Sequence, residues 1–143
     1  MKKFDPELSI LVIDDDAMVK SILVEYLQSM GFKNILAAKS SAHGLQIVHD
    51  QKYRIDLIVS DWEMPEVTGL TLLKAVRNNP QRKNTPFMLV TSQRSMERFK
   101  ISQAAQWAVN CYMVKPFRLE LFSQKVFEVM GWSNDKDTPK KVS

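Results

Sequence analysis

The chain has 143 residues, a length typical of one domain, and its single cysteine, Cys111, excludes an intrachain disulfide. The formal net charge is +4, but the lysines and arginines are scattered, so we expect ordinary solvated faces and no nucleic-acid surface. No apolar stretch follows the N-terminal lysines, and the apolar runs are too short to span a bilayer. We therefore expect a soluble, cytoplasmic protein with no secretory signal and no membrane insertion.

Short apolar runs alternate with segments in which apolar residues recur every three or four positions, as in amphipathic helices. The runs predict strands at 9–13, 34–38, 56–60, 87–90 and 111–114. The periodic segments predict helices at 17–30, 41–51, 69–79, 96–107 and 119–130. Five such units indicate an α/β fold with a doubly wound parallel sheet. The domain is expected over 8–132, between an N-terminal extension at 1–7 and a disordered polar tail at 133–143.

Three of the predicted strands end in charged residues. The first is followed by Asp14-Asp15-Asp16, the third by Asp61 and the fifth by Lys115-Pro116. Ligands of open parallel sheets bind beyond the carboxyl ends of the strands. Carboxylates from two strands and an ammonium group from a third are therefore expected to meet at one edge of the sheet.

This set of side chains is suited to binding a divalent cation and accepting a phosphoryl group. Asp14, Asp15 and Asp61 would repel one another at close range unless a cation lay between them, and Mg²⁺ prefers such oxygen ligands. Asp61 is the predicted nucleophile, because a carboxylate can form a covalent aspartyl phosphate. Lys115 adds a positive charge, and Thr91, at the end of the fourth strand, can donate a hydrogen bond to a phosphoryl oxygen.

Asp16 has two possible roles. It either approaches the metal site or begins the first helix, where a negative charge interacts favourably with the helix dipole. Of the two, we prefer the capping role.

The strand-end motifs resemble those of response regulator receiver domains of two-component systems, and most closely the single-domain chemotaxis type, the CheY-like proteins. The resemblance covers about residues 8–132 and rests on the segments 12–15, 59–65, 69–70, 90–92 and 112–117. It implies a flavodoxin-like sheet with strand order 2-1-3-4-5.

The resemblance also implies roles for the site residues. Asp61 would accept a phosphoryl group from a histidine kinase. Asp15 would bind Mg²⁺ directly and Asp14 through water, and the backbone carbonyl of Glu63 would complete the protein ligands. Thr91 and Lys115 would contact the phosphoryl group.

Three further features follow from the same resemblance. Tyr112 matches the aromatic switch residue of the family, which turns inward on activation when Thr91 moves towards the phosphoryl group. Pro116 matches a proline that usually follows a cis peptide bond. Glu63 and Gln93 lie two residues after Asp61 and Thr91, where side chains flank the path of the attacking water and are expected to tune the hydrolysis rate.

The partners implied are a CheA-like histidine kinase, a downstream target such as a flagellar motor switch component, and a phosphatase; the chain itself is expected to be monomeric. A non-chemotaxis receiver that acts as a phosphate sink or relay is the alternative. A phosphatase of the haloacid-dehalogenase type would need an Asp-x-Asp motif followed by threonine, which is absent here. A DNA-binding regulator would need an added domain.

The segment 106–109 departs from the family pattern, because it lacks the glycine usually found where the fourth helix ends. Ala108 would be strained in a left-handed conformation, so the helix end is expected to be either strained or rebuilt. Trp107 is expected to fill the core rather than to anchor a partner.

Overall fold

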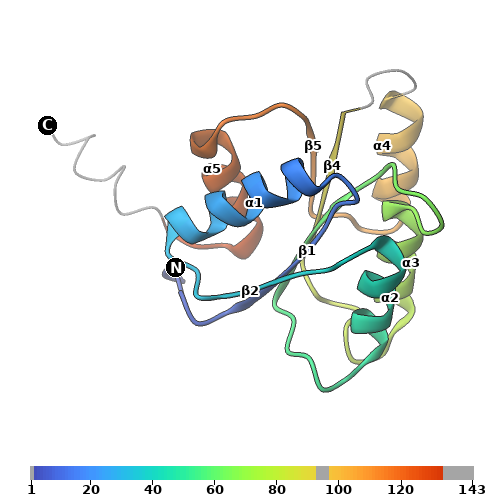
Figure 1. Ribbon diagram of the computed structural model, residues 1–143, viewed down its shortest axis with the longest axis horizontal. Coiled ribbons are helices and arrows are strands. Elements are labelled where there is room, and N and C mark those ends of the chain that lie inside the picture. The colour runs from blue at the N-terminus through green and yellow to red at the C-terminus, as the bar shows by residue number, and fades with distance from the viewer. Residues whose placement is uncertain (1, 93–96, 134–143) are drawn as a thin grey trace, which may run out of the picture.

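The computed structural model describes residues 2–92 and 97–133, and these form a parallel sheet between two layers of helices (Figure 1). The strands are β1 (Ser9–Ile13), β2 (Asn34–Ala37), β3 (Leu57–Asp61), β4 (Phe87–Thr91) and β5 (Cys111–Val114). The helices are α1 (Ala17–Met30), α2 (Ser41–His49), α3 (Gly69–Asn78), α4 (Glu97–Gln106) and α5 (Leu119–Met130). The strand order is β2-β1-β3-β4-β5, which confirms the predicted architecture.

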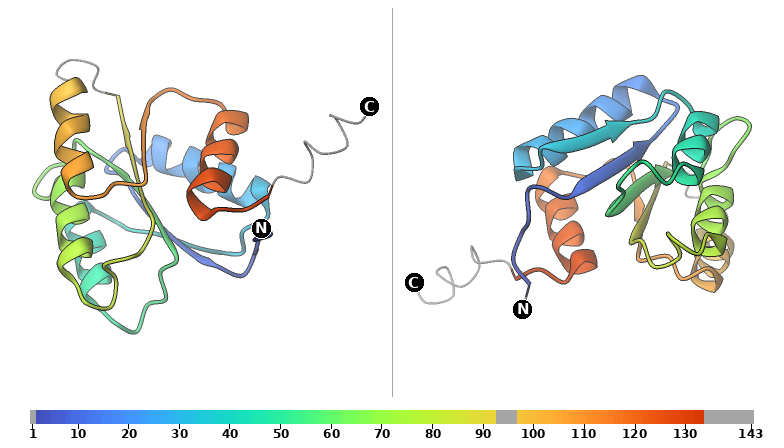
Figure 2. Two further views of the ribbon diagram at one scale, coloured as in Figure 1. Left: turned by 180° about the vertical axis from the view of Figure 1, so that it is seen from behind. Right: turned by 90° about the horizontal axis from the view of Figure 1, so that it is seen from below.

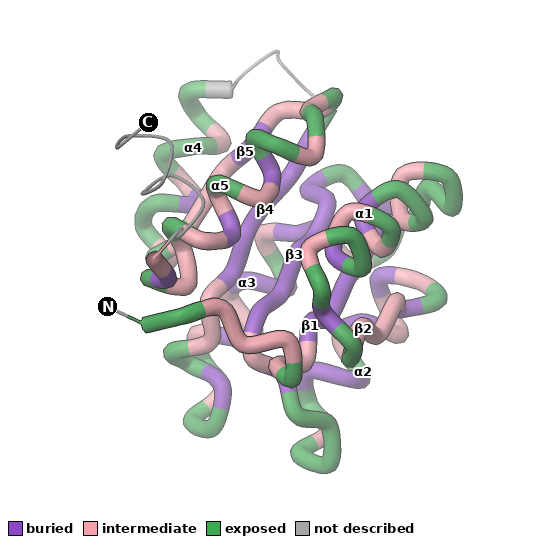
Figure 3. Tube along the Cα trace, turned by 90° about the vertical axis from the view of Figure 1, so that its left-hand side faces the viewer, coloured by how far each residue is buried: buried purple, intermediate pink, exposed green. Residues whose placement is uncertain are grey.

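The two layers of helices cover opposite faces of the sheet, as the views in Figure 2 show: α1 and α5 lie on one face and α2, α3 and α4 on the other. Each face has its own apolar core, one containing Leu27 and Phe122 and the other containing Val48 and Leu73. The three central strands, β1, β3 and β4, are buried between these cores, whereas the edge strands β2 and β5 are mostly half-buried (Figure 3). Burial on both faces explains why the strands read as continuous apolar runs without alternation.

Local signals in the sequence fix several helix ends. The side chain of Asp16 accepts hydrogen bonds from the backbone N–H groups of Met18 and Val19, which confirms its capping role. Gly31 ends α1 in a left-handed conformation with a φ of 111°, as glycine does at many helix ends. In the same way, Thr68 caps α3 through its side chain.

The second helix is shorter than the sequence predicts and ends at His49. The guanidinium of Arg82, which is 7% exposed, donates hydrogen bonds to the backbone carbonyls of Val48, Asp50 and Tyr53. It therefore satisfies carbonyl groups at this end of α2, and the helix does not continue to 51.

The end of α4 keeps the left-handed turn despite the missing glycine. Ala108 has a φ of 55°, and the N–H groups of Ala108 and Val109 donate to the carbonyls of Ala105 and Ala104, as in a Schellman motif. The strained alternative is thus the one observed. Arg77 supports this turn, because its guanidinium donates to the carbonyl of Ala108 at 2.8 Å.

Trp107 packs against the core on the α3 side, with the ammonium of Lys74 5.5 Å from its ring centroid. This placement agrees with the predicted role as core filler. Near the chain start, Phe4 packs against three aromatic rings, those of Phe32, Phe127 and Trp132. The residues before β1 thereby contact the ends of α1 and α5.

Within residues 2–92 and 97–133, no helix is both long and apolar enough to cross a membrane. Residues 93–96, which include Gln93, lie outside the described part of the chain. The same holds for residues 134–143, on which most of the predicted tail falls.

Candidate functional site

The parallel register brings the charged residues together at the carboxyl edge of the sheet. Ile13 pairs with Ser60, so Asp14 follows its strand at the level where Asp61 ends β3. Thr91 pairs with Val114 across β4 and β5, which places Lys115 just beyond. Because all five strands run the same way, residues separated by up to about a hundred positions meet here.

Asp14 and Asp61 are buried, with 1% and 6% of their surface exposed, and Lys115 lies between them. Its ammonium nitrogen is 3.1 Å from Oδ2 of Asp14 and 3.4 Å from Oδ1 of Asp61. Backbone N–H groups orient both carboxylates: that of Asp16 donates to Oδ1 of Asp14, and that of Trp62 donates to Oδ1 of Asp61, each at 2.9 Å. The ion pairs and hydrogen bonds hold the two carboxylates in fixed positions.

The acidic side chains form a potential cation site. Carboxylate oxygens of Asp14, Asp15 and Asp61 all lie within 4.8 Å of one another, and Asp15 is exposed to solvent. Burial, together with the charge of Asp14, raises the pKa of Asp61 from 3.8 to about 6, although the nearby Lys115 opposes this rise. A divalent cation would relieve this repulsion, and an all-oxygen donor set suits Mg²⁺.

Thr91 and Tyr112 lie on the same face of the sheet. Tyr112 pairs with Leu89, and Thr91 is two residues further along β4, so their side chains point to one face on neighbouring strands. Thr91 is fully buried and Tyr112 is half-buried. The ring of Tyr112 meets the ring of Trp62 edge-on, with centroids 6.2 Å apart. Aromatic packing therefore connects the predicted switch residue to the residue next to Asp61.

The loop after β3 is packed tightly against the acidic site. A Cβ atom at Gly69 would lie 2.2 Å from the backbone oxygen of Asp61 and 2.9 Å from the Cα of Trp62. The N–H of Gly69 donates to the carbonyl of Trp62 at 2.9 Å. Only glycine allows α3 to begin this close to Asp61, a requirement that sequence reasoning did not derive.

The side chain of Glu63 lies outside the acidic cluster and forms an ion pair with Lys100 of α4. Sequence reasoning missed Lys100, because it belongs to no motif and the direction of its side chain depends on how α4 packs. The Lys115–Pro116 peptide bond is cis, as the resemblance implied.

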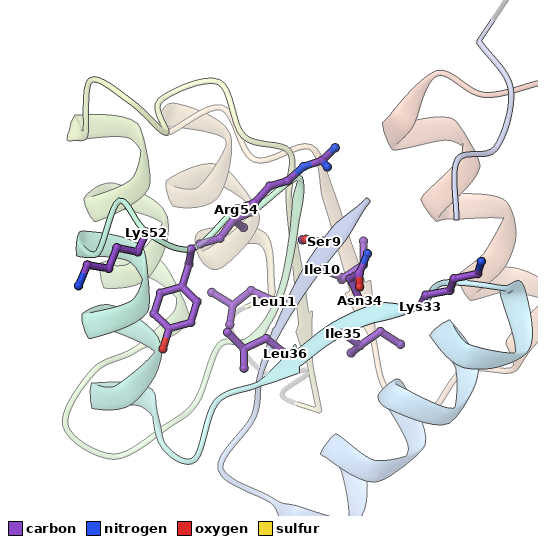
Figure 4. Close-up of a pocket in the computed structure, with 11 residues that line it drawn as sticks. Ser9, Ile10, Leu11, Lys33, Asn34, Ile35, Leu36, Lys52 and Arg54 are labelled. Atoms are coloured by element: carbon purple, nitrogen blue, oxygen red, sulfur yellow. The ribbon is translucent and has the colours of Figure 1, made fainter. Parts of the chain in front are cut away.

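A shallow groove of about 450 Å³ lies elsewhere, along β1 and β2, and Figure 4 shows side chains that line it. Ser9 and Asn34, which begin these two strands, are among its residues, together with Tyr53 and Arg54. The acidic residues follow the opposite ends of the strands. The groove is therefore separate from the acidic site.

Residues 10–127 match the response regulator receiver domain family. The chain is 34% identical over 122 residues to the chemotaxis protein CheY of Pseudomonas aeruginosa, covering 85% of this chain and 95% of that protein. The structure of the chemotaxis response regulator CheY4 of Vibrio cholerae superposes with a TM-score of 0.75 at 30% identity, covering 86% of this chain and 98% of that one.

A second structure, at 18% identity and a TM-score of 0.74, shares the fold alone; the match covers 87% of this chain and 98% of that one. It is the receiver domain of a sensor histidine kinase from Pseudomonas aeruginosa, with a magnesium ion coordinated in its active-site cleft. The predicted resemblance is confirmed, and the chain belongs to the response regulator receiver domain family.

Proposed function

We propose that the chain is a stand-alone response regulator that accepts a phosphoryl group from a histidine kinase on Asp61. The observation that carries this proposal is the position of Asp61: it is buried, its carboxylate lies within 4.8 Å of those of Asp14 and Asp15, and the ammonium of Lys115 is 3.4 Å away. The N–H of Trp62 orients the Asp61 carboxylate, and the ammonium of Lys115 lies where the negative charge of the phosphoryl group would arrive.

In the proposed reaction, a carboxylate oxygen of Asp61 attacks phosphorus, and the bond from phosphorus to the donor nitrogen of a kinase phosphohistidine breaks. Lys115 stabilises the charge on the phosphoryl oxygens, and the Thr91 hydroxyl donates to one of them. Asp14, Asp15, Asp61 and the backbone carbonyl of Glu63 would hold Mg²⁺, which when bound neutralises the charge that develops on the transferred group. Hydrolysis of the acyl phosphate returns Asp61 to its starting state.

The output of the proposed switch is protein binding. Phosphorylation adds negative charge and strong acceptor oxygens next to Thr91. A shift of Thr91 towards these oxygens would free space for the Tyr112 ring on the same face of the sheet. The similarity to chemotaxis proteins supports a cytoplasmic role in chemotaxis, with a CheA-like kinase and a motor switch component as partners. The alternative is a role as a phosphate sink or relay. In that case, no target protein should bind specifically when a phosphoryl mimic is present.

Intact-mass measurement after incubation with acetyl phosphate and Mg²⁺ tests the acceptor. We expect one phosphate per molecule in the wild type and in the control variant Asp56→Asn. Asp56 is a carboxylate outside the acidic site, and it pairs with Arg54 at 2.9 Å. Asp61→Asn should take none. Phosphorylation of Asp61→Asn at the wild-type rate would show that the acceptor lies elsewhere, and release of many phosphates per molecule would indicate a phosphatase.

A further inference from the structure

Lys100 connects α4 to the loop that carries the proposed phosphoacceptor. Its side chain is only 12% exposed, and its ammonium pairs with the carboxylate of Glu63. The same ammonium lies 5.4 Å from the ring centroid of Trp62, a distance typical of a cation–π interaction. Lys100 is therefore held by two residues that directly follow Asp61 in the chain.

Glu63 differs from Lys100 in that 47% of its side chain is exposed. Its backbone belongs to the tightly packed loop, but its carboxylate can rotate about three side-chain bonds once a partner is removed. Fully exposed ion pairs contribute little to stability. In this pair, however, Lys100 is nearly buried and also packs on the indole ring of Trp62. The arrangement is therefore suited to fixing the direction in which the Glu63 carboxylate points.

We propose that Lys100 is a positioning residue that holds the Glu63 carboxylate against α4 and neutralises it, so that an anionic phosphoryl donor can approach Asp61. This inference rests on the proposed function. Glu63 is two residues from Asp61, beside a site in which three carboxylates meet and one ammonium lies between two of them. A fourth, unpaired negative charge at its rim would repel a dianionic donor.

The initial rate of phosphorylation by acetyl phosphate, followed by intact mass at saturating Mg²⁺ before hydrolysis of the acyl phosphate contributes, tests this role. Lys100→Met should lower the rate by about threefold or more at low ionic strength, and the difference should shrink as salt screens the exposed carboxylate. Adding Glu63→Gln to Lys100→Met should restore the rate, because the charge that Lys100 neutralised is gone. Lys100→Arg should retain most of the wild-type rate.

Lys125→Met is the matched control, because it removes the same charge from another helix. Lys125 lies on α5 and pairs with Glu128 at 3.5 Å. This variant should phosphorylate at the wild-type rate.

Two results would overturn the role of Lys100 alone: equal rates in Lys100→Met and Lys125→Met, or a loss in Lys100→Met that Glu63→Gln does not restore. A wild type that takes no phosphate, or an Asp61→Asn variant that takes as much, would instead overturn the proposed function.

Discussion

Replacing Asp61 with asparagine should stabilise the metal-free protein at neutral pH. The carboxylate is 6% exposed and close to that of Asp14, so its ionised form is less favourable in the folded chain than in the unfolded one. Asparagine has nearly the same shape, keeps an oxygen for the N–H of Trp62, and carries no charge. Lys115 retains its contact with Asp14 at 3.1 Å in the variant.

The size of the effect follows from the pKa of Asp61, which is raised from 3.8 to about 6 by burial and by Asp14. A raised pKa means that the folded state binds the proton more tightly, so wild-type stability falls as pH rises from about 4 through 6. Two pKa units correspond to about 3 kcal/mol. The free energy of unfolding of Asp61→Asn should thus exceed that of the wild type by about 3 kcal/mol above pH 7 and differ little from it near pH 4.

Denaturant unfolding in the presence of a chelator, at several pH values from 4 to 8, measures this difference. Glu25→Gln is the control, because Glu25 is an exposed carboxylate on α1 and its removal should leave the pH dependence unchanged. Saturating Mg²⁺ should reduce the difference in unfolding free energy by stabilising the wild type. A ligand that binds only the native state adds about 2.7 kcal/mol to the unfolding free energy at a hundred times its dissociation constant. Parallel pH profiles for wild type and Asp61→Asn would refute the reasoning.

Three further substitutions, the second with a control variant, test contacts that hold the start of α3 and the end of α4. Gly69→Ala should cost several kcal/mol in unfolding free energy and slow phosphorylation, because its Cβ would lie 2.2 Å from the backbone oxygen of Asp61; unchanged stability would contradict this contact. Ala108→Gly should raise stability by about 1 kcal/mol in thermal melts by relieving a φ of 55°, whereas Ala105→Gly, within α4, should lower it. Arg77→Lys should destabilise the protein by about 2 kcal/mol or more in denaturant unfolding, since an ammonium cannot replace the guanidinium fork; a loss below 0.5 kcal/mol, within ordinary surface variation, would argue against this role.

The site is the part of the protein that the sequence predicts best. Each strand is a short apolar run, and parallel strands place their carboxyl ends at one edge of the sheet. The residues at these ends therefore converge independently of loop conformation: Asp14, Asp61, Thr91 and Lys115. The helix ends at Asp16 and Gly31 are also predictable from the sequence. Their capping hydrogen bonds join residues within one turn, so they do not depend on distant segments. The predicted roles of Glu63 and Tyr112 in signalling and hydrolysis stay predictions.

Features that depend on long side chains from distant segments were decided by the tertiary structure alone. Arg82 donates to the carbonyl of Val48 at the end of α2, 34 positions away, and Lys100 pairs with Glu63 across 37 positions. Ala108 keeps a left-handed turn that Arg77 supports from another helix. A sequence pattern reports which face of an element is apolar. Which polar group a long side chain reaches is settled only when the helices pack, because that choice depends on the position of a second element.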